Sequence, residues 1–183
     1  MHFMMSFLEL AKRRRTTYEF SPKAVPPSLL SKLLEAARWA PSPLNSQPYS
    51  FIVVKSKAAI KGIVDAAYYG NFHTYPSAII VIALLPEKAS EKSHRGMVGG
   101  KLGAAESSMS ISMPALMMEL EAADIGLGAC ILSLDEKKLP KIGLKKGERA
   151  LLAVGIGYSR PGTSTTGMHH RRKPLSELVR KGL

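Results

Sequence analysis

Residues 40–49 read Ala-Pro-Ser-Pro-Leu-Asn-Ser-Gln-Pro-Tyr, and this stretch joins a helix pattern to the strand formers Phe51 to Val54. Its three prolines remove backbone donors and restrict the backbone, so the loop has few conformations available. The loop also carries four uncharged hydrogen-bonding side chains, Ser42, Asn45, Ser46 and Gln47. Such groups suit a flat heteroaromatic ligand with several carbonyl and ring nitrogen atoms. The alternative is a proline-rich surface turn with solvated polar residues.

Two basic clusters favour a ligand-binding loop over a simple turn. The first runs from Arg13 to Phe20 and reads Arg-Arg-Arg-Thr-Thr-Tyr-Glu-Phe, and the second runs from His169 to Pro174. Arginine makes bidentate hydrogen bonds to phosphate oxygens, and threonine adds a neutral donor. Two basic clusters and one neutral polar loop would therefore suit a planar cofactor that carries a phosphate.

Helix and strand patterns alternate along the chain. Helical spacing of apolar residues predicts short helices at 4–13, at 29–37 with Ser28 as N-cap, and at 57–67. Runs of Val, Ile and Leu bounded by polar residues predict strands at 51–55, 78–85 and 150–157. Residues 97–125 predict a long helix, in which Pro114 predicts a kink or a restart near Ser112.

Composition predicts one domain spanning residues 1–183. The chain is 45% hydrophobic, which suffices for a full core, and no linker-like stretch marks a boundary. A single cysteine, Cys130, excludes an intrachain disulfide and fits a reducing compartment; we expect it to be a buried small hydrophobe. The first residues lack a signal-peptide pattern, and no apolar run is long enough to cross a bilayer. We therefore expect a cytoplasmic protein with no membrane partner.

The formal net charge of +12 raises the question of a nucleic-acid partner. The lysines and arginines are spread along the chain among acidic residues, and the aromatic residues do not interleave with them. None of the usual nucleic-acid motifs is present. We expect a solvated basic surface with some arginines reserved for an anionic cofactor, rather than a nucleic-acid-binding face.

Other cofactor motifs are missing from the sequence. Neither HExxH nor CxxC occurs, and His169-His170 have no carboxylate or cysteine at ligand spacing, so we expect no metal site. There is no P-loop and no GxGxxG, so a nicotinamide donor would not be held on a Rossmann domain. Four methionines favour flexible core filler; they are Met109, Met113, Met117 and Met118.

The order of these motifs resembles the nitroreductase family of flavoproteins. Residues 14–20 resemble its opening basic pair, hydroxyl residue and Phe, and residues 36–49 resemble its Ala-Arg-Trp-Ala-Pro-Ser and Asn-x-Gln-Pro-aromatic segments. Residues 122–130 are similar to its Gly-Leu-Gly segment after a long helix. Residues 153–158 and 172–175 look like its final strand and its C-terminal Arg-x-Pro-Leu. The resemblance thus covers nearly the whole chain in the same order.

The resemblance implies an α+β fold, with a central mixed sheet flanked by helices, in an intertwined homodimer that holds FMN at the subunit interface. It implies a ping-pong oxidoreductase in which NADH or NADPH gives a hydride to flavin N5. A nitro compound, quinone or similar small molecule would then accept it. No side-chain acid or base is expected, because the flavin carries the redox chemistry. Two alternatives stay open: a flavin dehalogenase, and a basic nucleic-acid- or anion-binding protein of the same fold without turnover.

The same resemblance assigns site residues. The group implied for the phosphate is basic or hydroxylic and comprises Arg14, Arg15, Thr16, His170 and Arg172. The group implied for the ribityl chain and the ring lies mainly in the proline-rich loop and comprises Pro41, Ser42, Asn45, Gln47 and Asn71. A backbone N–H at Ser133 is implied to reach flavin N5, and substrate choice is implied to depend on the loop at 86–100.

One position departs from the family pattern. Family members usually carry Arg or Lys at the position before Glu19, where the charge stabilises the reduced ring. This chain has Tyr18 there, which the resemblance implies to contact the cofactor, and Thr74 stands in place of a second basic residue. The loss of positive charge near the ring would lower its reduction potential. Lys101 or an arginine of the second subunit is the candidate replacement.

Overall fold

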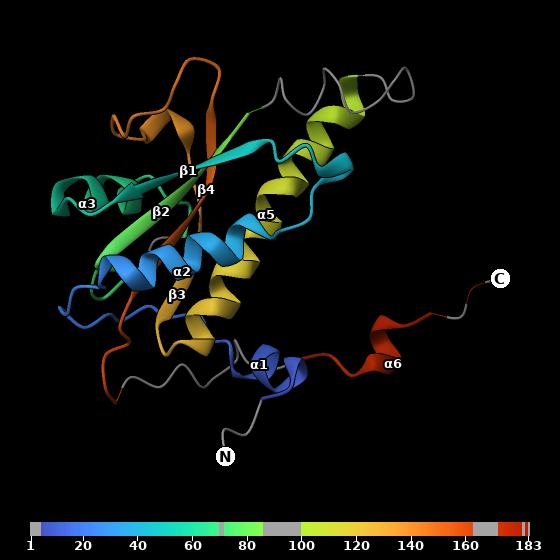
Figure 1. Cartoon of the computed structure of the whole chain (residues 1–183), viewed down its shortest axis with the longest axis horizontal. Helices are drawn as coiled ribbons and strands as arrows, with labels where there is room; N and C mark the ends of the chain where they lie inside the picture. Colours follow the sequence, from blue (N-terminus) through green and yellow to red (C-terminus); the bar gives the residue numbers. More distant parts are fainter. Residues whose placement is uncertain (1–4, 70–71, 86–99, 163–171, 181, 183) are drawn as a thin grey trace.

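The computed structural model describes residues 5–69, 72–85, 100–162, 172–180 and 182. It has an α+β architecture in which helices cover both faces of a four-stranded sheet (Figure 1). The strands are β1 (Tyr49–Val54), β2 (Ala78–Leu84), β3 (Gly128–Ser133) and β4 (Arg149–Gly157). The helices are α1 (Phe7–Arg13), α2 (Pro27–Arg38), α3 (Lys57–Asp65), α5 (Gly100–Asp124) and α6 (Leu175–Leu178), with 3-10 turns η1 (Pro43–Asn45) and η2 (Glu136–Lys138).

The sheet has the order β1-β2-β4-β3, and every neighbouring pair of strands is antiparallel. The predicted α+β fold is confirmed. The sheet was predicted to mix parallel and antiparallel strands, but among the described residues parallel pairing is confined to isolated bridges. Parallel pairing occurs at Thr16 with Ala129 and at Glu19 with Thr74. The bridge at Thr16 brings the segment that follows α1 alongside the outer edge of β3, where the backbone N–H of Thr17 donates to the carbonyl of Ala129 at 2.8 Å.

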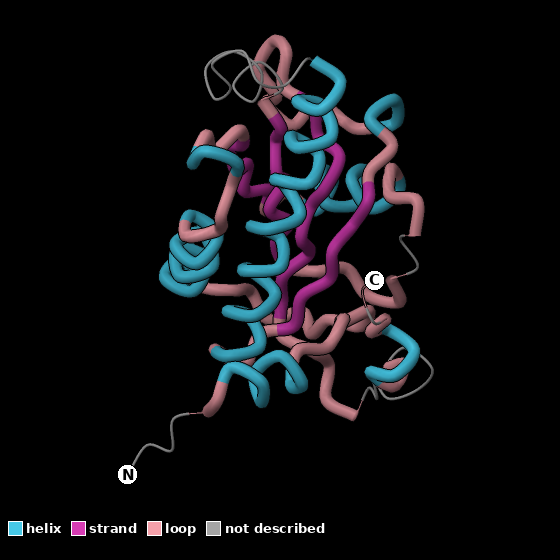
Figure 2. Tube along the Cα trace, turned by 90° about the vertical axis from the view of Figure 1, so that its right-hand side faces the viewer, coloured by secondary structure: helices cyan, strands magenta, loops and turns pink. Residues whose placement is uncertain are grey.

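Strand β2 separates two apolar layers. Its residues Ala78, Ile80, Ile82 and Leu84 belong to a core cluster with residues of α2 and α5. Figure 2 shows the long helix α5 running along the sheet. The intervening Ile79 and Val81 belong to a second cluster with α3. Because successive side chains of a strand point to opposite faces, a strand covered on both faces has to be apolar throughout. This burial explains the continuous aliphatic run in the sequence.

Helix α5 runs unbroken from Gly100 to Asp124, so it does not restart near Ser112. Pro114 lies inside it, on the buried side, next to the fully buried Ala115. Packing against the sheet on either side of the proline can hold the helix together despite one lost backbone hydrogen bond.

The methionines of α5 do not all fill the core. Met118 is fully buried, whereas Met109 and Met113 are 61% and 40% exposed. Helical geometry explains this exposure. Met109 and Met113 are four residues apart and therefore share one face of α5, and that face points away from the core in which Met118 packs. Within one chain, Met118 therefore fills the core as expected, whereas Met109 and Met113 do not.

Local signals explain where most other elements begin. Ser6 and Glu9 form a capping box that starts α1. The predicted cap at Ser28 is wrong: α2 begins at Pro27, whose fixed φ suits a first helical position. The three predicted strands are confirmed within a residue or two, while β3 was missed. None of the helices in the described ranges is long and apolar enough to span a membrane.

Candidate functional site

The basic segment after α1 lies against the outer edge of β3. Arg14 ends the helix, and its backbone N–H donates to Leu10 at 2.9 Å. Thr17 is buried, and its hydroxyl lies 3.2 Å from that of Ser159. Because neighbouring side chains of an extended segment alternate in direction, the burial of Thr17 directs its neighbours Thr16 and Tyr18 the other way.

Gly128 allows this close approach. A Cβ atom at Gly128 would lie 2.5 Å from the Thr17 hydroxyl oxygen and 2.6 Å from the Ser159 hydroxyl oxygen, closer than real contacts allow. A glycine at the start of β3 is therefore required for the basic segment to lie where it does. This contact gives a physical reason for the second glycine of the Gly-Leu-Gly motif.

Arg14 is held by a buried carboxylate that the sequence analysis did not identify. Its Nη1 lies 3.2 Å from Oε2 of Glu119 on α5, and Glu119 is only 6% exposed. Burial raises the pKa of Glu119, while Arg14 and the backbone N–H of Ile131 oppose that rise by stabilising the charged form. The signal in the sequence was a glutamate between Met118 and Leu120, within the apolar half of a long helix.

Arg15 turns back on α1. Its Nη1 donates to the carbonyl of Arg14 at 3.0 Å and also to the carbonyl of Lys12. Basic side chains commonly satisfy the last carbonyls of a helix in this way. Arg15 also lines a small cavity of about 260 Å³ together with Thr17 and Glu119.

Tyr18 presents a neutral phenol near the start of β3. Its side chain is 37% exposed, and its ring centroid lies 6.1 Å from that of Phe72. Partial burial, with smaller contributions from Cys130 and Glu119, raises the pKa of Tyr18. Burial also raises the pKa of the Cys130 thiol to about 12, which fits the expectation of a buried, unreactive cysteine. Thr74 accepts a 2.6 Å hydrogen bond from the backbone of Phe20.

The proline-rich loop is tied together by its own polar side chains. The Ser42 hydroxyl accepts from the backbone N–H of Gln47 at 2.9 Å, and the Gln47 amide donates to the Asn45 side chain at 3.0 Å. Asn45 and Gln47 have φ values of 55° and 45°. Left-handed backbone is costly for non-glycine residues and persists where the surroundings enforce it. Pro41, at the start of the loop, is exposed.

Ser133 directs its backbone toward the same edge of β3 as the basic segment. The N–H of Leu134 donates to the carbonyl of Leu151 in β4, so the N–H and C=O of the neighbouring Ser133 point the opposite way. Accordingly, the carbonyl of Ser133 accepts from the backbone of Tyr68 at 3.0 Å, and that of Ala129 accepts from Thr17. Ser133 lies four residues, or about 13 Å, beyond Ala129 along the strand.

The structure brings some predicted residues together and separates others. Thr16 and the backbone of Ser133 share the outer edge of β3, and Arg14 and Tyr18 flank Thr16 along the segment that binds this edge. The loop around η1 lies toward the other end of α5, a helix about 37 Å long, as Figure 1 shows. Arg172 is exposed and precedes α6. Asn71, His170 and the loop at 86–99 lie outside the described residues, and nothing is described of the Lys101 side chain.

Metal chemistry finds no support in the part of the chain that the structure describes. No group of three or more His, Cys, Asp or Glu side chains lies there in a metal-binding arrangement. The donor set at the β3 edge is instead cationic, hydroxylic and amide, which suits a phosphate and a ring with carbonyl and nitrogen atoms.

The chain is similar to a known protein family and to several known proteins. A family model described as Nitroreductase family matches residues 11–74. A Thermus thermophilus protein named NADH dehydrogenase is 30% identical over 92% of each chain. A Methanothermobacter thermautotrophicus protein named for NADH dehydrogenase and NAD(P)H nitroreductase is 36% identical, over 42% of this chain and only 41% of its own length. A Desulfovibrio desulfuricans nitroreductase solved in complex with FMN has a TM-score of 0.75, covers 96% of each chain and is 24% identical, which shows the fold.

We predict that Glu119→Gln changes stability in a pH-dependent way. With a raised pKa in the folded state, Glu119 contributes stability that is full below its unfolded pKa and lost as pH rises through the folded pKa. The free energy of unfolding of the variant minus that of the wild type should therefore increase as pH rises above about 4.5, measured by urea unfolding at a series of pH values.

Arg14→Gln is the matched comparison for this experiment. It removes the positive charge that holds down the pKa of Glu119. The free energy of unfolding of this variant should therefore keep falling to a higher pH than that of the wild type. A difference between Glu119→Gln and wild type that decreases with pH would contradict the prediction, since it would mean that the ion pair outweighs burial.

Proposed function

Because the chain belongs to the nitroreductase family, we propose that it is an FMN-dependent oxidoreductase that uses NADH or NADPH to reduce a small-molecule acceptor. The observation that carries the proposal is the outer edge of β3, along which the segment that follows α1 is bound at Ala129 and toward which the backbone of Ser133 points. The names of the Thermus and Methanothermobacter relatives and the FMN complex of the Desulfovibrio protein support it. When bound, FMN would accept a hydride and pass reducing equivalents to a nitro compound, a quinone or a similar molecule.

The phosphate end of the site would depend on Arg14 and Thr16. The contact with Glu119 uses one terminal nitrogen of the Arg14 guanidinium, and 19% of the Arg14 side chain stays exposed. Glu119 would thus fix the direction of the guanidinium, at the cost of offsetting part of its charge toward an anion. Arg172 and His170 would add further donors by family resemblance.

The ring end of the site would depend on backbone groups and on Tyr18. The Ser133 N–H faces the outer edge of β3, away from β4, where a donor would stabilise a ring nitrogen. Tyr18 would contribute a neutral phenol in place of a cation. The residues of this chain would bind and orient the ring, and none is assigned as a catalytic acid or base.

We further propose that the working form is a homodimer, in which the proline-rich loop of one copy completes the β3 edge of the other. Support comes from the separation of this loop from Arg14 along α5 within one chain (Figure 1). Exposed Met109, Met113 and Leu116 also give α5 an apolar stripe on the side away from its own sheet. Such a stripe is typical of a helix that packs against a partner.

The direct test is a visible absorption spectrum of the purified protein with FMN, before and after anaerobic addition of NADH or NADPH. We expect flavin bands that bleach with at least one of the two nucleotides. Bands that persist with both would contradict the proposed electron donors. A protein that stays colourless after incubation with FMN would contradict the proposal as a whole and favour a binding protein of the same fold without turnover.

Arg14→Gln should weaken FMN binding by about tenfold to a hundredfold, because a hydrogen bond to a charged group is worth about 1.5–3 kcal/mol. Quenching of flavin fluorescence on titration measures the affinity. Riboflavin lacks the phosphate, so its affinity should be nearly unchanged in the variant. Arg13→Gln is the control, since Arg13 is the exposed last residue of α1. Equal losses for FMN and riboflavin would place Arg14 elsewhere than at the phosphate.

Tyr18→Arg should raise the midpoint potential of bound FMN, because a cation near the ring stabilises its reduced, anionic form. One pKa unit of added stabilisation corresponds to a shift on the order of 30 mV for a two-electron couple. Spectroelectrochemical or dye-equilibrium titration measures the potential. Tyr18→Phe keeps the ring but adds no charge, so its potential should stay close to the wild-type value. An unchanged potential in Tyr18→Arg would show that Tyr18 lies away from the flavin.

A further inference from the structure

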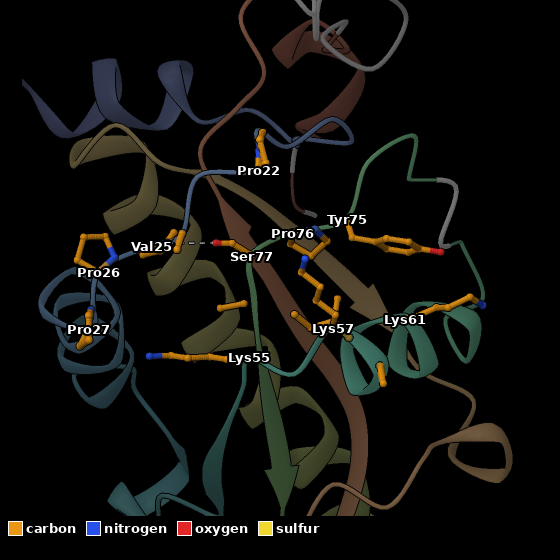
Figure 3. Close-up of a pocket in the computed structure, with 14 residues that line it drawn as sticks. Pro22, Val25, Pro26, Pro27, Lys55, Lys57, Lys61, Tyr75, Pro76 and Ser77 are labelled. Atoms are coloured by element: carbon orange, nitrogen blue, oxygen red, sulfur yellow. Dashed lines mark hydrogen bonds between the residues drawn. The ribbon is translucent and has the colours of Figure 1, made fainter.

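A larger cavity lies away from the β3 edge, between the beginnings of α2, α3 and β2 (Figure 3). Its volume is about 890 Å³, within the range of roughly 300–1,000 Å³ typical of small-molecule sites. None of the residues predicted to contact the cofactor lines it. The cavity therefore belongs to a different part of the surface from the proposed flavin site.

The base of this cavity is apolar. Val25, Ile60 and Ala78 are 6%, 3% and 1% exposed and contribute to it. Prolines form much of the wall, namely Pro22, Pro26, Pro27 and Pro76. The two sides are joined by a 3.3 Å hydrogen bond from the backbone N–H of Val25 to the Ser77 hydroxyl, drawn in Figure 3. Rigid walls lower the ordering cost of binding, so the cavity is suited to a ligand without rearrangement.

The charged lining of the cavity is entirely positive. Lys55, Lys57 and Lys61 line it, and no lining residue is acidic. Lys61 pairs with Asp65 at 2.5 Å, whereas Lys55 and Lys57 have no ion pair with any residue that the structure describes. Figure 3 shows Lys55 directed toward the side of Pro26 and Pro27, and Lys57 directed toward Pro76.

Few uncharged polar side chains in the cavity lining are available to form specific hydrogen bonds to a ligand. The Ser77 hydroxyl already accepts from Val25 and lies 3.4 Å from the carbonyl of Ile156. The remaining polar side chain is Tyr75, which is 46% exposed. Recognition here would come from apolar contact and positive charge rather than from a hydrogen-bond pattern.

We propose that this cavity binds a small amphipathic anion: an aromatic or aliphatic carboxylate or sulfonate. Its apolar body lies on Val25, Ile60 and Ala78, and its charged group meets Lys55 and Lys57. The two features on which it depends are a buried apolar base and a cationic margin without acidic residues. A purely polar anion would leave the base unfilled, and a neutral apolar molecule would gain nothing from the lysines. The site is independent of the proposed flavin chemistry.

The test is calorimetric titration of the FMN-saturated protein with 1-naphthaleneacetate and with its neutral analogue, 1-naphthaleneacetamide. The anion should bind about tenfold or more tightly than the amide, as expected for two nearby cations at a partly exposed site. Lys55→Gln/Lys57→Gln should weaken binding of the anion by about tenfold and leave the amide unchanged. Lys145→Gln/Lys146→Gln removes two exposed lysines that do not line the cavity and should change neither affinity.

Ala58→Trp provides a second variant that acts through shape. Ala58 is an exposed residue of α3 that lines the cavity, so an indole there should occupy part of it and weaken binding of both compounds while flavin binding persists. The proposal is overturned if the wild type binds neither compound, as it would if a partner subunit covered the cavity. Equal weakening of the anion in both lysine variants would also overturn it, because it would show attraction to net charge alone.

Discussion

The burial of β2 on both faces is the constraint on which the rest of the structure depends. All seven of its residues are buried, so α2 and α5 must cover one face and α3 the other. With β2 and β4 inside the sheet, only β1 and β3 are left with an open edge. Within a sheet, unpaired backbone N–H and C=O groups are found at such edges. The candidate cofactor site lies on one of these two edge strands, β3, where the segment after α1 already uses part of the edge.

Much of the fold could be predicted because its signals are local. The aliphatic run of β2 and the apolar spacing of α2 and α3 each report burial directly from the sequence. Strand β3 was missed because it begins with Gly128, directly after Gly126 and Leu127, so it reads as the end of a glycine-containing turn. Its glycine is explained by the hydroxyls of Thr17 and Ser159, which are distant in sequence.

The site could be predicted as a set of residue types but not as an arrangement. Motif order singled out Arg14, Thr16 and Tyr18, and the structure lays the segment that holds them against β3, where Thr16 bridges to Ala129. It could not reveal that Glu119 lies beside Arg14, because the two are 105 positions apart and meet only when α5 packs on the sheet. Nor could motif order reveal that the proline-rich loop lies toward the end of α5 opposite Arg14. The loop and Arg14 are close in sequence, but their places along α5 are set only by how the elements pack.

Strand β1 is the second open edge of the sheet, and its outer side pairs with no other strand in the described part of the chain. Its sequence, Tyr-Ser-Phe-Ile-Val-Val, has no charge and no proline, and Val53 is 38% exposed. Uncharged edge strands of this kind are templates for intermolecular pairing and aggregation. The outer side of β1 is therefore a place where unwanted pairing between copies of this chain can begin, for example during expression at high concentration.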